Sequence, residues 1–244
     1  MIKYEFPLNE RIRRFLRIEE IFKKMESQIT VRKEFSAYSC FNTYFDIVAI
    51  ASRADLKIEL IQEVEKQRLK FKSKTKTKKN LSVINDLNRI RVQIEKSKSI
   101  TGFNFGGDKF LHELKTRSAS PFGIVSTDFP EFQFWLQSTS LADKKAYFKK
   151  KLIDFGTIKL AITYLMKLLR SNVDTSSMET KTGAIQFKLD PQLKNDIVII
   201  TLGASSNYFP NISSNKYVVN VHFPTHLSNT KSKIVKFKFG VSTF

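Results

Sequence analysis

Residues 216–223 read KYVVNVHF, a stretch in which polar and apolar side chains alternate. Successive side chains of a β-strand point to opposite faces, so this stretch predicts a strand with one buried and one accessible face. The expected core face consists of Tyr217, Val219, Val221 and Phe223. The expected accessible face consists of Lys216, Val218, Asn220 and His222. The segment therefore predicts a β-sheet near the C-terminal end of the sequence.

Neighbouring segments have the same β-rich composition: IQFKL at 185–189, DIVIITL at 196–202 and KIVKFKF at 233–239. Clusters of Asn, Ser, Pro and Gly separate them, which is typical of turns between antiparallel strands. In KIVKFKF, Lys236 and Lys238 alternate with phenylalanines. Two interpretations of this pattern stay open, a solvated sheet face and a groove for an acidic peptide.

Upstream of these strands, apolar residues recur at three- and four-residue steps, which predicts amphipathic helices. Asn9 is a candidate N-cap of the first helix. The segment KSKTKTKK at 72–79 joins two charged helices, which predicts a helical hairpin. The predicted helices run from Asn9 to about Ile29, from about Glu34 to Ala51, over 52–71 and 80–98, from about Asp108 to Lys115, and from Ala142 to Arg170.

Between the short helix and the last one, SPFGIVSTDFPEFQFWL at 120–136 combines β-branched and aromatic residues and is interpreted as strand-forming. We therefore expect an α+β protein with two domains. The mainly helical domain, with its long hairpin, takes residues 1–112 and 140–172. The antiparallel β-domain takes the middle segment, 113–139, and the C-terminal strands, 180–244.

Positive charge dominates the composition, with 42 Lys and Arg against 23 Asp and Glu. The resulting field attracts anionic partners, so nucleic acid, an acidic lipid surface and an acidic protein are all admissible. Arginines crowd the start of the first helix at Arg11, Arg13, Arg14 and Arg17. Repulsion between arginines four residues apart and the unfavourable interaction with the helix dipole each cost about a few tenths of a kcal/mol, which leaves the role of this cluster open.

A second basic stretch, 66–79, holds eight positive side chains and no negative one. Like charges repel one another in a packed interior, so the first interpretation is a solvated hairpin tip. A platform for single-stranded nucleic acid would need aromatic side chains for base stacking, and only Phe71 is present.

Enzyme and nucleotide motifs are not found. The segment GFNFGGDK at 102–109 spaces Gly102 and Gly107 as a phosphate-binding loop does, but Asp108 stands where the lysine is required. No GxSxG elbow and no Asp-rich metal loop occurs. We expect a protein without enzymatic activity and without a cofactor.

Metal-site signals are equally weak. His112, His222 and His226 form no HExxH pair, and the single cysteine, Cys40, allows no common zinc ligand set. Cys40 is interpreted as a buried, reduced thiol, which fits a reducing cytoplasm. No apolar run approaches the roughly 20 residues of a membrane-spanning helix, and the first residues contain no apolar h-region, so we expect a soluble protein that is not exported.

Four stretches together resemble the Z-ring-associated protein D family, ZapD: PLNERIRRFLRIEEIF at 7–22, RADLKIELIQEVEKQR at 53–68, DFPEFQFWL at 128–136 and YFPNISSNKYVVNVHF at 208–223. The resemblance implies a non-enzymatic bacterial division protein of the cytoplasm, recruited to midcell. It implies a homodimer that binds the tubulin-like protein FtsZ and cross-links its filaments. We expect the helical domains to form the dimer through apolar helix faces. The short C-terminal tail of FtsZ would lie in a basic pocket.

The resemblance also implies partner-binding residues, of which Arg13 and Arg17 lie in the PLNExxRxxLRIE signature. His222 stands where the resemblance implies an arginine, so the charge at this position depends on pH. The full set of implied partner-binding residues is Arg13, Arg17, Arg53, Lys109, Arg117, Lys216 and His222.

A basic nucleic-acid-binding protein is the main alternative, because the same charge would neutralise phosphates. It predicts an affinity that falls steeply with salt and depends little on any peptide sequence. No recognised nucleic-acid motif supports it. An enzyme of unrecognised type is the second alternative, and a deep pocket with titratable groups would distinguish it.

Overall fold

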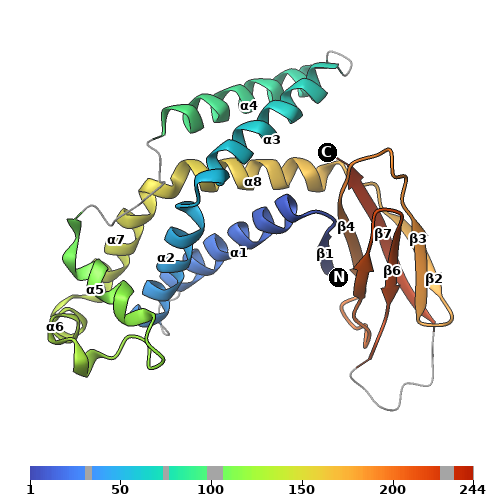
Figure 1. Ribbon diagram of the computed structural model, residues 1–244. Coiled ribbons are helices and arrows are strands. Elements are labelled where there is room, and N and C mark those ends of the chain that lie inside the picture. The colour runs from blue at the N-terminus through green and yellow to red at the C-terminus, as the bar shows by residue number, and fades with distance from the viewer. Residues whose placement is uncertain (31–34, 74–76, 98–106, 226–233, 244) are drawn as a thin grey trace. The chain divides into compact units, whose positions relative to one another are not determined.

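The computed structural model describes residues 1–30, 35–73, 77–97, 107–225 and 234–243 (Figure 1). Gly102, His226 and two lysines of the basic stretch, Lys74 and Lys76, lie outside these ranges. The α-helices are α1 (Glu10–Thr30), α2 (Ala37–Ala51), α3 (Ala54–Ser73), α4 (Lys78–Lys96), α5 (Lys109–Ser118), α6 (Pro130–Ser138), α7 (Leu141–Leu152) and α8 (Gly156–Ser171). The strands are β1 (Ile2–Pro7), β2 (Ser176–Thr180), β3 (Ala184–Lys188), β4 (Asn195–Leu202), β5 (Asn211–Ser214), β6 (Val218–His222) and β7 (Val235–Thr243). The predicted α+β class is confirmed.

The chain divides into two compact units. The strand unit consists of Met1–Leu16 and Tyr164–Phe244, and the described strands all belong to it. The helical unit consists of Arg17–Thr163. The helical unit is therefore a single insertion between the first residues of the strand unit and the remainder of that unit.

The strand unit contains two antiparallel sheets, with strand orders β1-β4-β7-β2 and β3-β6-β5. One side of each sheet contributes to a shared apolar core. Phe187 of β3 and Phe239 of β7 stack within it, with ring centroids 3.6 Å apart. The fully or nearly fully buried members are Val198, Ile200, Leu202, Val219, Val221, Phe223, Val235, Phe237 and Phe239.

The alternation in 216–223 is confirmed within β6, where Val219 and Val221 are buried while Asn220 and His222 are exposed. Tyr217 was expected in the core, but it is 59% exposed. The reason is local, because β6 begins only at Val218. Tyr217 belongs to the preceding turn, in which its backbone N–H donates to Asn215 Oδ1 at 2.8 Å.

The strand β1 was not predicted, because its pairing depends on residues far along the chain. It pairs antiparallel with β4, from Ile2 opposite Leu202 to Pro7 opposite Ile197. Directly after β1, Asn9 caps α1 as predicted, since its Oδ1 accepts from the N–H of Ile12 at 2.9 Å. Its Nδ2 donates to the carboxylate of Asp196 at 2.6 Å, which ties the start of α1 to the start of β4.

The helical unit is built around α2, which corresponds to the helix predicted to end at Ala51. Phe41 is fully buried, and its ring lies 5.7 Å from that of Phe132, 5.4 Å from that of Trp135 and 4.8 Å from that of Phe148, measured between centroids. The predicted hairpin is formed by α3 and α4, which pack along each other (Figure 1).

The strand prediction for the middle segment, 113–139, is wrong. These residues form most of α5, a 3₁₀ turn at Ser126–Asp128 and α6, and they lie in the helical unit. Pro130 occupies the first turn of α6, where its missing N–H costs nothing. Phe129 and Phe132 recur at a helical step and pack into the aromatic core, so this composition reflects burial of rings and not a pleated sheet.

The single helix predicted from Ala142 to Arg170 is also divided. A 3₁₀ turn at Ile153–Phe155 separates α7 from α8. Phe155 is fully buried there, and its ring lies 6.1 Å from that of Tyr44 on α2. Burial of this ring accompanies the break, and α8 then begins at Gly156.

Replacement of Gly240 by alanine is expected to destabilise the strand unit. A Cβ atom at this position of β7 would lie 2.6 Å from the backbone oxygen of Asp174 and 2.6 Å from a methyl group of Val173. Backbone atoms cannot move aside cheaply, so we expect a loss of about 1–3 kcal/mol in the free energy of unfolding, measured with urea. Gly203→Ala is the matched control, since no atom lies within 4 Å of its added Cβ. Equal unfolding midpoints for the two variants would contradict the packing argument.

The ion pair between Glu5 of β1 and Arg170 of α8 predicts a pH-dependent stability. Arg170 donates two hydrogen bonds of 2.7 Å to this carboxylate. Burial alone raises the pKa of Glu5, but hydrogen bonds from Arg170 and Lys3 and their charges outweigh it and lower the pKa below 4.5. The pair therefore stabilises the fold above pH 4.5, and this contribution is lost as the pH falls through the lowered pKa.

We expect Glu5→Gln to reduce the free energy of unfolding by about 1–2 kcal/mol near neutral pH. The difference from wild type should shrink in acid, as followed by urea unfolding at a series of pH values. Glu10→Gln removes the exposed ion pair with Arg13 and should change stability by less than about 1 kcal/mol. A Glu5→Gln effect that is the same at every pH would show that the carboxylate charge does not matter.

Candidate functional site

The seven basic and histidine residues expected to bind a partner are distributed over both units. Arg13, Lys216 and His222 belong to the strand unit, and Arg17, Arg53, Lys109 and Arg117 belong to the helical unit. Arg13 and Arg17 lie one turn apart on α1. In the strand unit the structure separates Lys216 from His222, because Lys216 lies in the turn before β6 and His222 is the last residue of that strand.

The two signature arginines of α1, Arg13 and Arg17, differ in whether they form an ion pair within the fold. Arg13 is partly exposed and donates to Glu10 Oε1 at 3.0 Å. Arg17 is exposed, and its guanidinium makes no ion pair with any residue that the structure describes. Of the two signature arginines, Arg17 is therefore the more available to an acidic partner.

The other predicted cations of the helical unit stand at helix ends. Arg53 lies between α2 and α3 and is 3.8 Å from the carboxylate of Asp55. Lys109 is the exposed first residue of α5. Arg117, in the last turn of α5, places its guanidinium 5.0 Å from the ring centroid of Phe129, which holds the side chain against the aromatic core.

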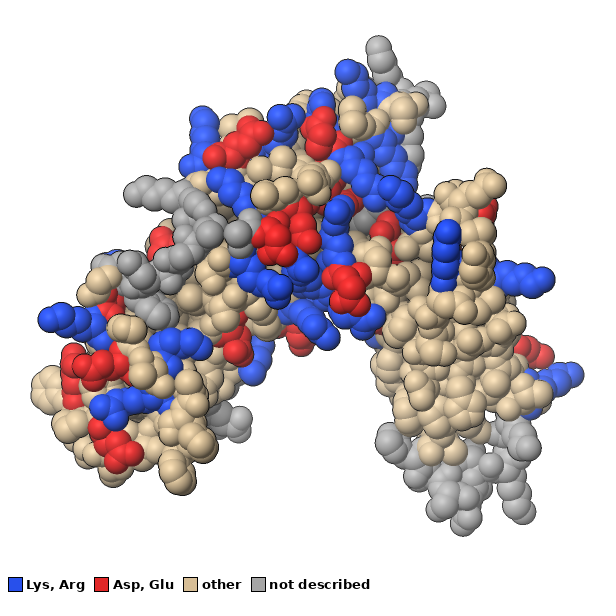
Figure 2. Space-filling model, in the orientation of Figure 1, with Lys and Arg blue, Asp and Glu red and all other residues tan. Residues whose placement is uncertain are grey.

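The described part of the lysine-rich stretch, 66–73 and 77–79, forms the end of the hairpin, as predicted. Some of its charges are neutralised locally, since Arg68 contacts Glu65 at 2.6 Å and Lys66 lies 3.7 Å from Glu63. Figure 2 shows Lys and Arg side chains concentrated over the hairpin, with acidic side chains among them. The face of the strand unit in the same view is mainly uncharged.

His222 lies on an uncharged polar surface, the outer face of the sheet β3-β6-β5. Its neighbours across the strands are Ala184 and Asn211. One row further, Gln186 Nε2 donates to Asn220 Oδ1 at 2.7 Å. These residues line a depression of about 500 Å³. Amide and hydroxyl groups there can exchange hydrogen bonds with a peptide, but they provide little charge for an acidic one.

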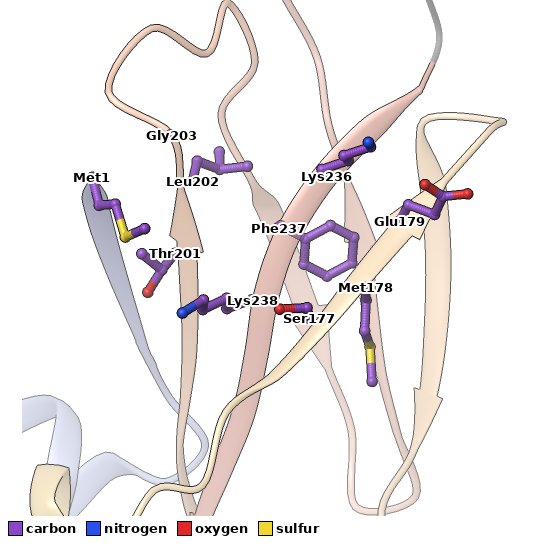
Figure 3. Close-up of a pocket in the computed structure, with 10 residues that line it drawn as sticks. All are labelled: Met1, Ser177, Met178, Glu179, Thr201, Leu202, Gly203, Lys236, Phe237 and Lys238. Atoms are coloured by element: carbon purple, nitrogen blue, oxygen red, sulfur yellow. The ribbon is translucent and has the colours of Figure 1, made fainter.

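A second depression of about 500 Å³ lies on the sheet β1-β4-β7-β2 (Figure 3). We call it the β7 lysine surface and define it by Ser177, Glu179, Thr201, Lys236 and Lys238. Lys238 stands opposite Thr201 on one side and Ser177 on the other, and Lys236 stands opposite Glu179. The sequence pointed to the two lysines, but the other three residues join them only through strand pairing.

Three titratable groups of the aromatic core have raised pKa values. Cys40 is fully buried, and burial raises the pKa of its thiol to about 11, so the thiolate is scarce at neutral pH. Burial likewise raises the pKa of the Tyr44 and Tyr147 hydroxyls, which lie in the aromatic core. The described residues contain no cluster of three potential metal ligands. None of the described helices has the length and apolar character needed to cross a membrane.

Comparison with known proteins identifies similar chains. A family model described as "ZapD: Cell division protein" matches residues 16–222. A cell division protein ZapD from Azoarcus sp. (strain BH72) is 28% identical over 228 residues, which cover 91% of this chain and 90% of the relative. A second one, from Janthinobacterium sp. (strain Marseille), is 28% identical over an alignment of 253 residues that spans both chains completely. These matches confirm the resemblance that the four sequence stretches indicated.

Proposed function

The chain belongs to the ZapD family of cell division proteins, and on this ground we propose that it binds the C-terminal tail of FtsZ and cross-links FtsZ filaments as a homodimer. The observation that carries the proposal is the family match over 16–222, a range that contains six of the seven basic or histidine positions named above. We propose that the protein acts in the cytoplasm, at the midcell division site. It performs no catalysis and needs no cofactor.

Arginine is well suited to hold an acidic tail. Its planar guanidinium donates two parallel hydrogen bonds to one carboxylate, which fixes orientation as well as charge. Arg17 is exposed and is our first candidate for this role. Lys216 is the second, because it is exposed in the turn before β6. Arg13, Arg53, Lys109, Arg117 and His222 complete the proposed set.

Dimerisation would convert tail binding into filament cross-linking. A flexible tail loses conformational entropy when it is ordered, so a single site is expected to bind it weakly. Two sites on one dimer would bind two neighbouring tails, and the second event would profit from a high effective concentration. We propose that the helical units provide the dimer contact, because apolar side chains such as Ile58 and Phe134 are exposed there, at 58% and 71%.

Nucleic-acid binding is the competing function, since the formal net charge is +19. The family match favours a division partner instead. The direct test is cosedimentation with polymerised FtsZ, either full-length or lacking its C-terminal tail, at physiological salt. We expect the protein to pellet with the full-length filaments only. Equal pelleting with both would contradict binding through the tail.

Charge reversal is expected to separate tail binding from dimerisation. Arg17→Glu and Lys216→Glu should each weaken binding of the tail about tenfold, or ~1.4 kcal/mol, because each places a like charge against the acidic ligand. Bundling, measured by light scattering, should fall accordingly, while sedimentation should still show a dimer.

Lys150→Glu is the control for this experiment. This exposed lysine of α7 is outside the proposed set, and its reversal changes the net charge by the same amount. If the Arg17 and Lys216 variants bundle filaments as well as the Lys150 variant does, the assignment of these residues is wrong.

A further inference from the structure

The outer face of the sheet β1-β4-β7-β2 is covered at one end and open at the other. At the covered end Ile197 and Ile199 of β4 are buried, and Ser242 of β7 donates to the backbone oxygen of Leu169 on α8 at 3.1 Å. Gly240 lies there against the backbone of Asp174. The covered end therefore forms part of the folded core.

The open end is the β7 lysine surface. Lys236 and Lys238 continue the same face of β7 beyond Gly240, but both are exposed. Neither ammonium group makes an ion pair with a residue that the structure describes. By contrast, Lys3 of β1, on the same face, is 3.0 Å from Glu5 and is thereby engaged within the fold. Two lysines outside the ion pairs of the fold thus line the depression.

The chemistry of this surface selects an anion. No Asp or Glu occurs from residue 197 to the end of the sequence, so β4 and β7 bring no competing carboxylate to the depression. Ser177 and Thr201 flank Lys238 by strand register, and their hydroxyl groups can donate to a bound carboxylate. Glu179, opposite Lys236, is the single acidic side chain among the residues that define the surface.

The two lysines also define the extent of the site. In Figure 3 the Lys238 side chain extends across β4 beside Thr201, whereas that of Lys236 is directed toward β2 and Glu179. An extended chain lying along β7 would therefore meet a cation on each side. A volume of about 500 Å³ suits a short peptide segment.

The same surface is poorly suited to nucleic acid. Base stacking needs an exposed ring, and the aromatic residue that lines the depression among the described ones, Phe237, is 4% exposed and faces the core. No arginine is among the lining residues that are described. An acidic peptide needs only cations and hydrogen-bond donors, and both are present.

We propose that the β7 lysine surface binds an extended acidic peptide segment, with Lys238 as its principal contact and Lys236 as a contact shared with Glu179. The surface includes none of the residues proposed above to hold the FtsZ tail. The inference therefore goes beyond the proposed function, and either can fail without the other.

The test uses the full-length protein and a short synthetic peptide rich in glutamate, labelled for fluorescence anisotropy, at physiological ionic strength. Under these conditions charges more than about 8 Å apart are largely screened, so direct contacts dominate the signal. The same peptide with glutamine in place of glutamate is expected to bind at least about tenfold more weakly. Equal binding of the two peptides would overturn the proposal.

Three variants and one control, Lys194→Glu, assign the site. Lys238→Glu should weaken the glutamate peptide about tenfold, while Lys194→Glu, in the exposed loop before β4, should leave it within about twofold. Glu179→Gln should strengthen binding about threefold, because it removes the carboxylate that competes for Lys236. Lys238→Gln removes the positive charge without introducing a negative one, so it controls for misfolding of Lys238→Glu. It should weaken binding of the glutamate peptide by a smaller factor.

Equal losses for the Lys238 and Lys194 variants would show that net charge alone attracts the peptide, and they would overturn the proposal. If Glu179→Gln binds the glutamate peptide no more tightly than wild type does, the role assigned to Lys236 is wrong.

A single-stranded oligonucleotide is the second ligand to be tested. If it binds more tightly than the peptide and loses affinity in Lys238→Glu, the surface is a nucleic-acid site and the proposal is wrong. Retention of the glutamate peptide by Arg17→Glu would separate this surface from the proposed FtsZ contact.

Discussion

The pairing of β1 with β4 is the constraint on which the strand unit depends. The first residues of the sequence supply an edge strand to a sheet whose other strands come after residue 175. Two side-chain contacts hold this junction: Asn9 bonds Asp196 at 2.6 Å, and Arg170 bonds Glu5 in bidentate fashion. Asp196 is buried, so loss of the Asn9 amide would leave a desolvated carboxylate without this hydrogen bond. The entire helical unit is inserted between the two segments that this junction joins.

The helical unit is organised by aromatic burial. Each buried ring contributes roughly 1.5–3 kcal/mol relative to an exposed one, and tilted or edge-to-face pairs add about 0.5–1.5 kcal/mol. Phe41 has several such neighbours, drawn from α6 and α7. This density of rings explains why the second half of the strand-like segment 120–136 folds as a 3₁₀ turn and the helix α6. Their side chains are needed on one face at a helical step, and a strand would direct every second one away from Phe41.

The balance of charge separates cations with a structural role from cations that remain available. In a chain of net charge +19, acidic side chains are scarce, and many of them are engaged in ion pairs, as Glu5 is with Arg170 and Glu65 with Arg68 and Arg91. The cations that matter for a partner are those outside such pairs, among them Arg17, Lys236 and Lys238. Of these, Arg17 and Lys238 offer an acidic ligand charge outside any ion pair of the described residues, whereas Lys236 stands opposite Glu179.

The sequence by itself determined the features that depend on neighbours along the chain. It gave the α+β class, the N-cap at Asn9, the hairpin of α3 and α4, and the alternation of buried and exposed residues in β6 and β7, because each rests on local periodicity or capping. The four family stretches also gave the membership in ZapD. Tertiary structure alone decided what depends on distant pairing. It made β1 a strand, converted the middle segment to helix, and placed Ser177, Glu179 and Thr201 beside the lysines of β7. These residues share a surface only because β2 and β4 pair with β7 in a particular register, and no periodicity within a single segment records the identity of a strand's partner.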